Sequence, residues 1–215
     1  MLQFYYHPLS PLARRVWIAL LEKKLPFESI LVNLKEGEQL QPEFLQLNPF
    51  HHVPVILDDG LRVIESIAIL DYLEAKYPQI SLLPTDPATL ARVRMVQMVT
   101  CNELGSQILT LIVESEKSLK LVKAKRCLKR VISFMAKLLE ENLYFGGEQF
   151  TIGDIVAGNA VILAHKLGFE VGSFANIAAW RQRLEAREVW QKTQPNQEQL
   201  EIFQATVKNQ KNSRN

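Results

Sequence analysis

The sequence is short of the residues that build metal sites and disulfide frameworks. It holds two cysteines, Cys101 and Cys127, and four histidines among 215 residues. Two cysteines in a chain of this size do not make a disulfide framework, so we expect a reducing, cytoplasmic compartment. The cysteines and histidines show no clustered spacing, and we therefore expect no metal ion.

Long apolar runs and an excess of one charge are also lacking. No apolar stretch reaches the roughly 18 residues of a membrane span. Met1 leads at once into a strand-like run, so we expect no signal peptide. The net charge of +2 is too small to indicate a nucleic-acid partner. The basic residues of the segment 117–130 are interpreted as a solvated helix face rather than an anion site. We expect neither a membrane nor a nucleic acid as partner.

The apolar content is sufficient for a sizeable core, at 47% of residues. In the first third of the chain, strand and helix patterns alternate in the order β-α-β-α-β-β-α. Strands are predicted at 2–6, 27–32, 53–57 and 61–64, and helices at 11–24, after Pro42 and at 65–77. Asp58-Asp59-Gly60 predicts a hairpin turn. A proline opening the third strand, Pro54, is typical of a thioredoxin-like domain.

A different pattern follows a proline-rich boundary. Residues 78–87 contain three prolines and no helical periodicity, which predicts a linker. Helices are predicted beyond it at 88–116, 118–141, 152–167, 174–186 and 188–194, and the polar end 208–215 is expected to fray. Thr151 and Asp154 have the spacing of a capping box. We therefore predict an α/β domain at 1–77, a linker at 78–87 and an all-helical domain at 88–215.

Four motifs occur in one order across about residues 2–165. They are Ser10-Pro11-x-x-Arg14-x-Val16, Asn48-Pro49-Phe50-x-x-Val53-Pro54, Glu65-Ser66-x-Ala68-Ile69, and Phe150-Thr151-Ile152-Gly153-Asp154. Together they resemble the cytosolic glutathione transferases of the serine type, which include the theta, phi, zeta and several bacterial classes.

The resemblance implies a fold and an activity. The fold would be an α/β thioredoxin-like N-terminal domain joined to an all-α C-terminal domain. The activity would be attack of the glutathione thiolate on a small apolar electrophile, as in detoxification by conjugation. Glutathione would be the co-substrate, and the chain would form a cytoplasmic homodimer.

Ser10 is the predicted activator of the thiol. A free thiol has a pKa of about 8.5, so the thiolate needs stabilising at neutral pH. Ser10 lies between a strand and a helix N-terminus, where a hydroxyl donor and the helix dipole act together. Ser10 could instead only cap its helix, and Tyr5 or Tyr6 could activate the thiol. Since no cysteine precedes Cys101, a mixed disulfide at this turn is not expected.

The remaining glutathione contacts follow from the resemblance and the chemistry of the ligand. Glu65 and Ser66 suit the ammonium and carboxylate of the γ-glutamyl end, or they form only a capping pair. Val53, held by Pro54, would pair with the cysteinyl backbone. Gln39 and His52 are candidates for the glycyl carboxylate, although His52 could be a surface histidine without a role.

The electrophile pocket is predicted from apolar residues near the turn and the first long helix: Pro8, Leu9, Cys101 and Leu104. These residue types favour an apolar electrophile and name none. The same site could serve a glutathione-dependent isomerase, dehalogenase or peroxidase. A non-catalytic glutathione-binding protein of the same fold is a further alternative.

Overall fold

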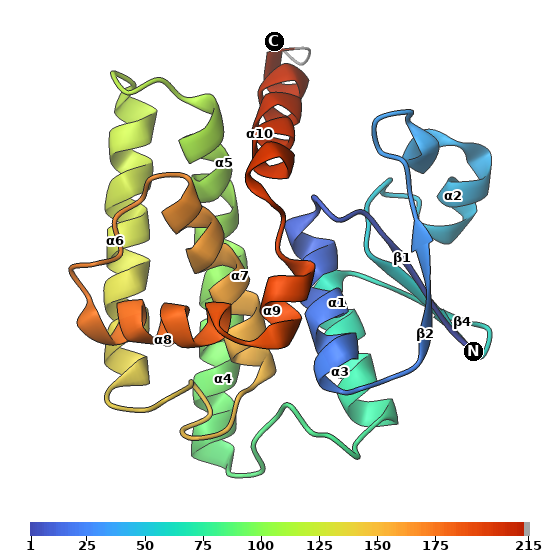
Figure 1. Ribbon diagram of the computed structural model, residues 1–215, viewed down its shortest axis with the longest axis horizontal. Helices are drawn as coiled ribbons and strands as arrows, with labels where there is room; N and C mark the ends of the chain where they lie inside the picture. Colours follow the sequence, from blue (N-terminus) through green and yellow to red (C-terminus); the bar gives the residue numbers. More distant parts are fainter. Residues whose placement is uncertain (213–215) are drawn as a thin grey trace. The chain divides into compact units, whose positions relative to one another are not determined.

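The computed structural model describes residues 1–212 and divides the chain into two compact units, Met1–Ser81 and Leu82–Asn215. The first unit is a four-stranded sheet with helices, and the second is helical throughout. This architecture confirms the predicted fold class, a thioredoxin-like unit followed by an all-helical one (Figure 1). Within the described residues, no helix is both long and apolar enough to cross a membrane.

The sheet of the first unit has the strand order β2-β1-β3-β4. β1 pairs with β2 in parallel and with β3 antiparallel, and β3 pairs antiparallel with β4. α1 and α3 lie on one side of the sheet and α2 on the other (Figure 1). The elements are β1 (Leu2–Tyr6), α1 (Pro11–Glu22), β2 (Phe27–Leu31), η1 (Glu38–Leu40), α2 (Pro42–Leu47), β3 (Val55–Asp58), β4 (Leu61–Ile64) and α3 (Ser66–Lys76).

Local sequence accounts for the main turns of this unit. Ser10 caps α1, and Pro11 occupies its first turn, where a missing N–H costs nothing. Asp59 and Gly60 both have positive φ, 50° and 83°, as the predicted two-residue hairpin requires. Phe4, Leu20 and Ile56 are fully buried and form part of the core between sheet and helices.

A buried carboxylate ties the end of β3 to the end of α3. The Asp58 side chain is 2% exposed and accepts hydrogen bonds from the hydroxyls of Tyr72 (2.9 Å) and Tyr77 (2.6 Å). The Lys76 ammonium lies 3.0 Å from the same oxygen. Burial alone would raise the pKa of Asp58, but the bonds from Tyr77, Lys76 and Tyr72 outweigh burial and hold the pKa below its ordinary value.

The second unit consists of α4 (Pro87–Val99), η2 (Thr100–Leu104), α5 (Gly105–Val113), α6 (Leu119–Leu139), α7 (Ile152–Lys166), α8 (Ala175–Glu185), α9 (Glu188–Thr193) and α10 (Gln197–Asn212). α7 is the central helix, because twelve of its fifteen residues are buried. At Gly158 a Cβ atom would come within 2.3 Å of Leu184 and 2.7 Å of Trp190. Only glycine therefore lets α8 and α9 approach α7 this closely.

Two features of the helical unit differ from expectation. The first predicted helix, 88–116, is interrupted at Thr100–Leu104 by a π-helical stretch, which periodicity does not reveal. The polar end was expected to fray from Lys208, but α10 continues to Asn212, and residues 213–215 lie outside the described chain. Leu200, 3% exposed, gives α10 a buried anchor.

The predicted capping box of α7 is present. The Asp154 carboxylate is fully buried and accepts bonds from the Thr151 N–H (2.9 Å) and hydroxyl (2.7 Å). Its other oxygen accepts from the Phe145 N–H (3.0 Å) and the Trp180 indole N–H (2.9 Å). Asp154 thus joins the start of α7 to α8 and to the preceding loop.

Candidate active site

Ser10 lies in a turn between β1 and α1. Its backbone is extended, with φ −81° and ψ 112°, and its N–H donates to the His7 carbonyl (2.9 Å). Its Oγ accepts a hydrogen bond from the Ala13 N–H (3.2 Å). Because capping uses a lone pair of the hydroxyl, the O–H proton stays available to a second partner. The cap and the thiol-activating role are therefore chemically compatible.

The His7 imidazole belongs to the same turn. Its Nδ1 accepts a hydrogen bond from the Leu9 N–H (3.2 Å). Burial lowers the pKa of His7 and favours the neutral ring, whose unprotonated nitrogen is the one that can accept. The sequence did not indicate this role, since nothing in the spacing of His7 predicts a side-chain bond to the backbone.

The segment before β3 is held by a buried asparagine. The Val53–Pro54 peptide bond is cis, and Val53 is 5% exposed. Asn48, 1% exposed, donates its side-chain amide to the His52 carbonyl (2.7 Å), and its Oδ1 accepts from the Phe50 N–H (3.0 Å). Asn48 fixes the loop that leads to Val53. Its place in the Asn-Pro-Phe motif was the signal that could have identified this role.

Glu65 and Ser66 form the start of α3. Glu65 is its N-cap residue with φ 67°, a conformation that side chains with a Cβ rarely adopt, and its exposed side chain does not cap the helix. The buried Ser66 hydroxyl accepts from the Arg15 guanidinium (3.5 Å). Glu65 therefore caps α3 through its backbone carbonyl, which accepts from the Ile69 N–H (2.9 Å), and its carboxylate makes no capping bond. The glutathione contacts of Glu65 and Ser66 stay a prediction.

Arg15 is a third residue, after His7 and Asn48, whose role the sequence did not reveal. It is 8% exposed and reaches from α1 to Ser66 on α3. A guanidinium beneath a helix N-terminus adds positive potential where a carboxylate would bind. Two adjacent arginines on an apolar helix, Arg14 and Arg15, were the available signal, because arginine is seldom buried without a partner.

Strand register brings these segments to one end of the sheet. Tyr5 pairs with Val55, and Val55 pairs with Ile64 on its other side. The Ser10 turn follows β1, Val53-Pro54 precedes β3, and Glu65-Ser66 follows β4. All three segments therefore lie at the same end of neighbouring strands. A peptide lying along this edge would meet a hydroxyl, a backbone segment and a helix N-terminus in turn. The residues present therefore fit a short anionic peptide such as glutathione.

The other predicted site residues have different surroundings. Gln39 lies in η1, and its buried Oε1 has no hydrogen-bond partner among the described residues, while the His52 side chain is exposed. Tyr6 packs between Phe4 and Trp17 (5.1 Å to each ring), and Tyr5 lies on the opposite face of β1.

The predicted electrophile contacts come from both units. Pro8 and Leu9 are half-buried beside Ser10 in the first unit. Cys101 is half-buried and Leu104 fully buried in η2 of the second unit. Their role in an electrophile pocket stays a prediction.

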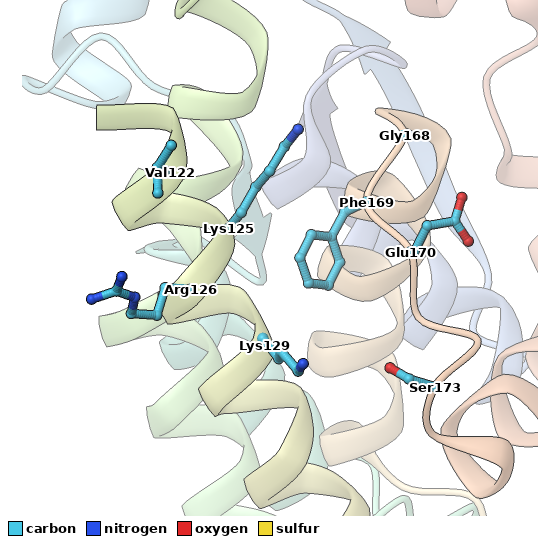
Figure 2. A pocket seen from close by; sticks show the side chains of 8 residues that line it. All are labelled: Val122, Lys125, Arg126, Lys129, Gly168, Phe169, Glu170 and Ser173. Carbon is cyan, nitrogen blue, oxygen red and sulfur yellow. The ribbon is translucent and has the colours of Figure 1, made fainter. Parts of the chain in front are cut away.

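A separate hollow of about 530 Å³ lies wholly in the helical unit, between α6 and the loop 168–173. Figure 2 shows Lys125 and Lys129 reaching towards this loop on either side of Phe169, while Arg126 points away from it. Lys125 is 45% exposed and pairs with Glu116 at 3.3 Å. These cations belong to the segment interpreted as a solvated helix face, and the hollow contains none of the predicted glutathione contacts.

Comparison with known proteins decides the family. A family model described as "Glutathione S-transferase, N-terminal domain" matches residues 9–76, and "Glutathione S-transferase, C-terminal domain" matches residues 90–188. The chain belongs to the glutathione S-transferase family. It is accordingly an enzyme with glutathione transferase activity, and glutathione is its co-substrate.

Individual glutathione transferases support this membership. The chain is 31% identical over 187 residues to glutathione S-transferase D7 of Drosophila melanogaster, covering 83% of this chain and 82% of that protein. It is 37% identical over 168 residues to glutathione S-transferase 1 of Dianthus caryophyllus, covering 75% and 76%. A delta-class glutathione transferase structure from Nilaparvata lugens superimposes with a TM-score of 0.82 at 26% identity, covering 97% and 99% of the chains.

Proposed function

We propose that this glutathione transferase is of the serine type and that the Ser10 hydroxyl stabilises the glutathione thiolate. The observation that carries the proposal is the geometry of Ser10, whose Oγ accepts from the Ala13 N–H and thereby keeps its proton for another acceptor. Accepting that bond polarises the O–H and strengthens its donation to sulfur. The N-terminus of α1 adds a positive partial charge at the same place.

The rest of the proposed site orients glutathione. The Glu65 carboxylate attracts the γ-glutamyl ammonium, and Ser66 with the α3 N-terminus binds the α-carboxylate. The backbone of Val53, before Pro54, pairs with the cysteinyl residue. Gln39 and His52 are the proposed contacts of the glycyl carboxylate. Pro8 and Leu9, beside Ser10, are the proposed first contacts of a small apolar electrophile. The proposed reaction is conjugation of the kind used in detoxification.

The test of Ser10 compares two substitutions. Ser10→Ala removes the hydroxyl, whereas Ser10→Thr keeps it. We expect Ser10→Ala to raise the pKa of bound glutathione and to lower kcat with an aryl halide about 10- to 100-fold, the value of one hydrogen bond to a charged group. Ser10→Thr retains most of the activity. The measurement is the ultraviolet titration of the thiolate in the enzyme–glutathione complex.

An unchanged titration in Ser10→Ala would contradict the assignment and direct attention to Tyr5 and Tyr6. In that case Tyr5→Phe is the next variant, because the Tyr6 ring is held between Phe4 and Trp17. A panel of electrophiles, assayed with and without glutathione, separates conjugation from isomerase, dehalogenase and peroxidase activity.

We also propose that the enzyme works as a cytoplasmic homodimer. Exposed apolar side chains support self-association, because burying such surface stabilises an interface. Phe50 in the first unit is 58% exposed, and Met95 and Met98 on α4 are 44% and 51% exposed. The two free cysteines are in keeping with a reducing compartment.

A further inference from the structure

We propose that His7 is a positioning residue for the reaction, whose imidazole Nδ1 holds the turn that carries the Ser10 hydroxyl. The inference rests on the proposed role of Ser10. It assigns to His7 a structural hydrogen bond and no contact with the substrate.

In the turn between β1 and α1, the backbone N–H groups donate to acceptors of a single residue. Pro8 has no N–H, so residues 8–10 contain two backbone donors. The Leu9 N–H donates to the His7 Nδ1 (3.2 Å), and the Ser10 N–H donates to the His7 carbonyl (2.9 Å). One residue therefore receives both donors of the turn.

The side-chain bond to Leu9 reproduces an Asx turn, in which a side chain accepts from the N–H two residues later. Asparagine makes this turn with its Oδ1, which is attached to Cγ as Nδ1 is in histidine. Phenylalanine has a ring of similar size and lacks the acceptor. His7→Asn thus keeps the acceptor without the ring, and His7→Phe keeps a ring without the acceptor.

The turn matters for catalysis because it fixes Ser10 on its N-terminal side, while the Arg14 N–H holds the Ser10 carbonyl (3.0 Å) on the helix side. Ser10 is half-buried, and its hydroxyl is directed by the cap to Ala13 and by the backbone that His7 holds. A hydroxyl serves a thiolate only if it stays within hydrogen-bond distance, and small displacements weaken such a bond steeply. Loss of the Leu9 bond would let the turn relax while the glutathione contacts at Val53 and Glu65 remain in place.

The experiment compares the full-length enzyme with His7→Phe, His7→Asn and Ser10→Ala. We expect His7→Phe to raise the pKa of bound glutathione by up to about one unit and to lower kcat by up to about tenfold, the effect of one lost hydrogen bond. The KM for glutathione should change by less than about twofold, since its contacts lie elsewhere. His7→Asn should stay within about twofold of the wild type.

Several outcomes overturn the inference. It fails if His7→Phe behaves as the wild type, or if His7→Asn is as impaired as His7→Phe, which would indicate that the ring packs against substrate or transfers a proton. If Ser10→Ala leaves the thiolate unchanged, the proposed function itself fails and takes this inference with it. If only Ser10→Ala is impaired, the inference alone fails. Should His7→Phe not fold, His7→Gln, whose acceptor lies one bond further from the backbone, replaces it.

Discussion

At the scale of single residues, Glu65 combines an uncommon backbone conformation with an exposed carboxylate that caps nothing. A positive φ in a residue other than glycine costs about 1–3 kcal/mol and persists where the surroundings impose it. The Glu65 side chain makes no capping hydrogen bond to the helix that Glu65 precedes. The arrangement favours a binding role, because a cap would have used the carboxylate locally.

Glu65→Gln is expected to weaken glutathione binding while leaving chemistry intact. The amide keeps the size and removes the charge that the γ-glutamyl ammonium would meet. We expect the KM for glutathione to rise about tenfold, the value of one charge-assisted hydrogen bond, with kcat changed little. Steady-state kinetics with varied glutathione measure both constants. Glu43→Gln, an exposed glutamate on α2, is the control and should leave both unchanged; a fall in kcat alone in Glu65→Gln would contradict the assignment.

Ser10 and Asn48 also show how one polar side chain sets a backbone path. The Ser10 hydroxyl accepts a hydrogen bond from the Ala13 N–H at the start of α1. The Asn48 side chain donates to the His52 carbonyl and accepts from the Phe50 N–H. Both residues are small and polar at loop positions, where their side chains compete well for backbone groups. The first was identified from its neighbours in the sequence. The role of the second became visible only once its partners were in place.

At the scale of elements, Asp58 with Tyr72, Tyr77 and Lys76 (the Asp58 cluster) connects the β3–β4 hairpin to the C-terminal end of α3. The proposed site lies at the N-terminal end of the same helix. The lowered pKa of Asp58 means that the native state holds its proton less tightly than the unfolded chain. Its contribution to stability is therefore complete above the ordinary pKa of an aspartate and is lost as pH falls through the lowered value.

Asp58→Asn should accordingly destabilise the protein at pH 7 by about 2–3 kcal/mol. The hydroxyls of Tyr72 and Tyr77 and the ammonium of Lys76 would each lose a charged acceptor. The difference from the wild type should shrink as the pH falls below about 4. Urea unfolding at several pH values measures this. Asp59→Asn is the matched control: Asp59 also pairs with Lys76 (2.7 Å) but is 70% exposed, so its loss should destabilise the protein far less than Asp58→Asn. An equal loss of unfolding free energy in the two variants would show that the burial of Asp58 does not determine its contribution to stability.

Among the helices, α6 and α7 illustrate two kinds of sequence signal. α6 has a buried stripe that includes Leu121, Leu128 and Met135, and its boundaries lie within two residues of those expected from periodicity. α7 has no such stripe because all its faces are covered, and its capping box located its start instead. The π-helical stretch η2 has neither signal, since a single extra residue in a turn leaves the apolar pattern on both sides intact.

At the scale of the whole molecule, the proposed homodimer makes a prediction about Phe50. An aromatic side chain that is 58% exposed in the monomer would lose that exposure in an interface. We expect Phe50→Ser to raise the dimer dissociation constant at least about tenfold, as measured by analytical ultracentrifugation. Leu119→Ser, at a residue 77% exposed on α6, is the control and should leave the dimer intact. A wild-type chain that sediments as a monomer at micromolar concentration would contradict the proposal.

Local sequence was enough to predict the order of the strands, the hairpin at Asp59-Gly60, the caps at Ser10 and Thr151, and the motifs that resemble glutathione transferases. These are local features, set by dihedral preference, capping and apolar period within a few residues. The pairing of Tyr5 with Val55 and of Val55 with Ile64 depends on the folded sheet, and it brings Ser10, Val53 and Glu65 to the same end of the sheet. The hydrogen bonds of His7 with Leu9, of Asn48 with His52 and of Arg15 with Ser66 were likewise not predictable from the sequence. Composition and spacing report no direction for a side chain, and hydrogen bonds depend on direction.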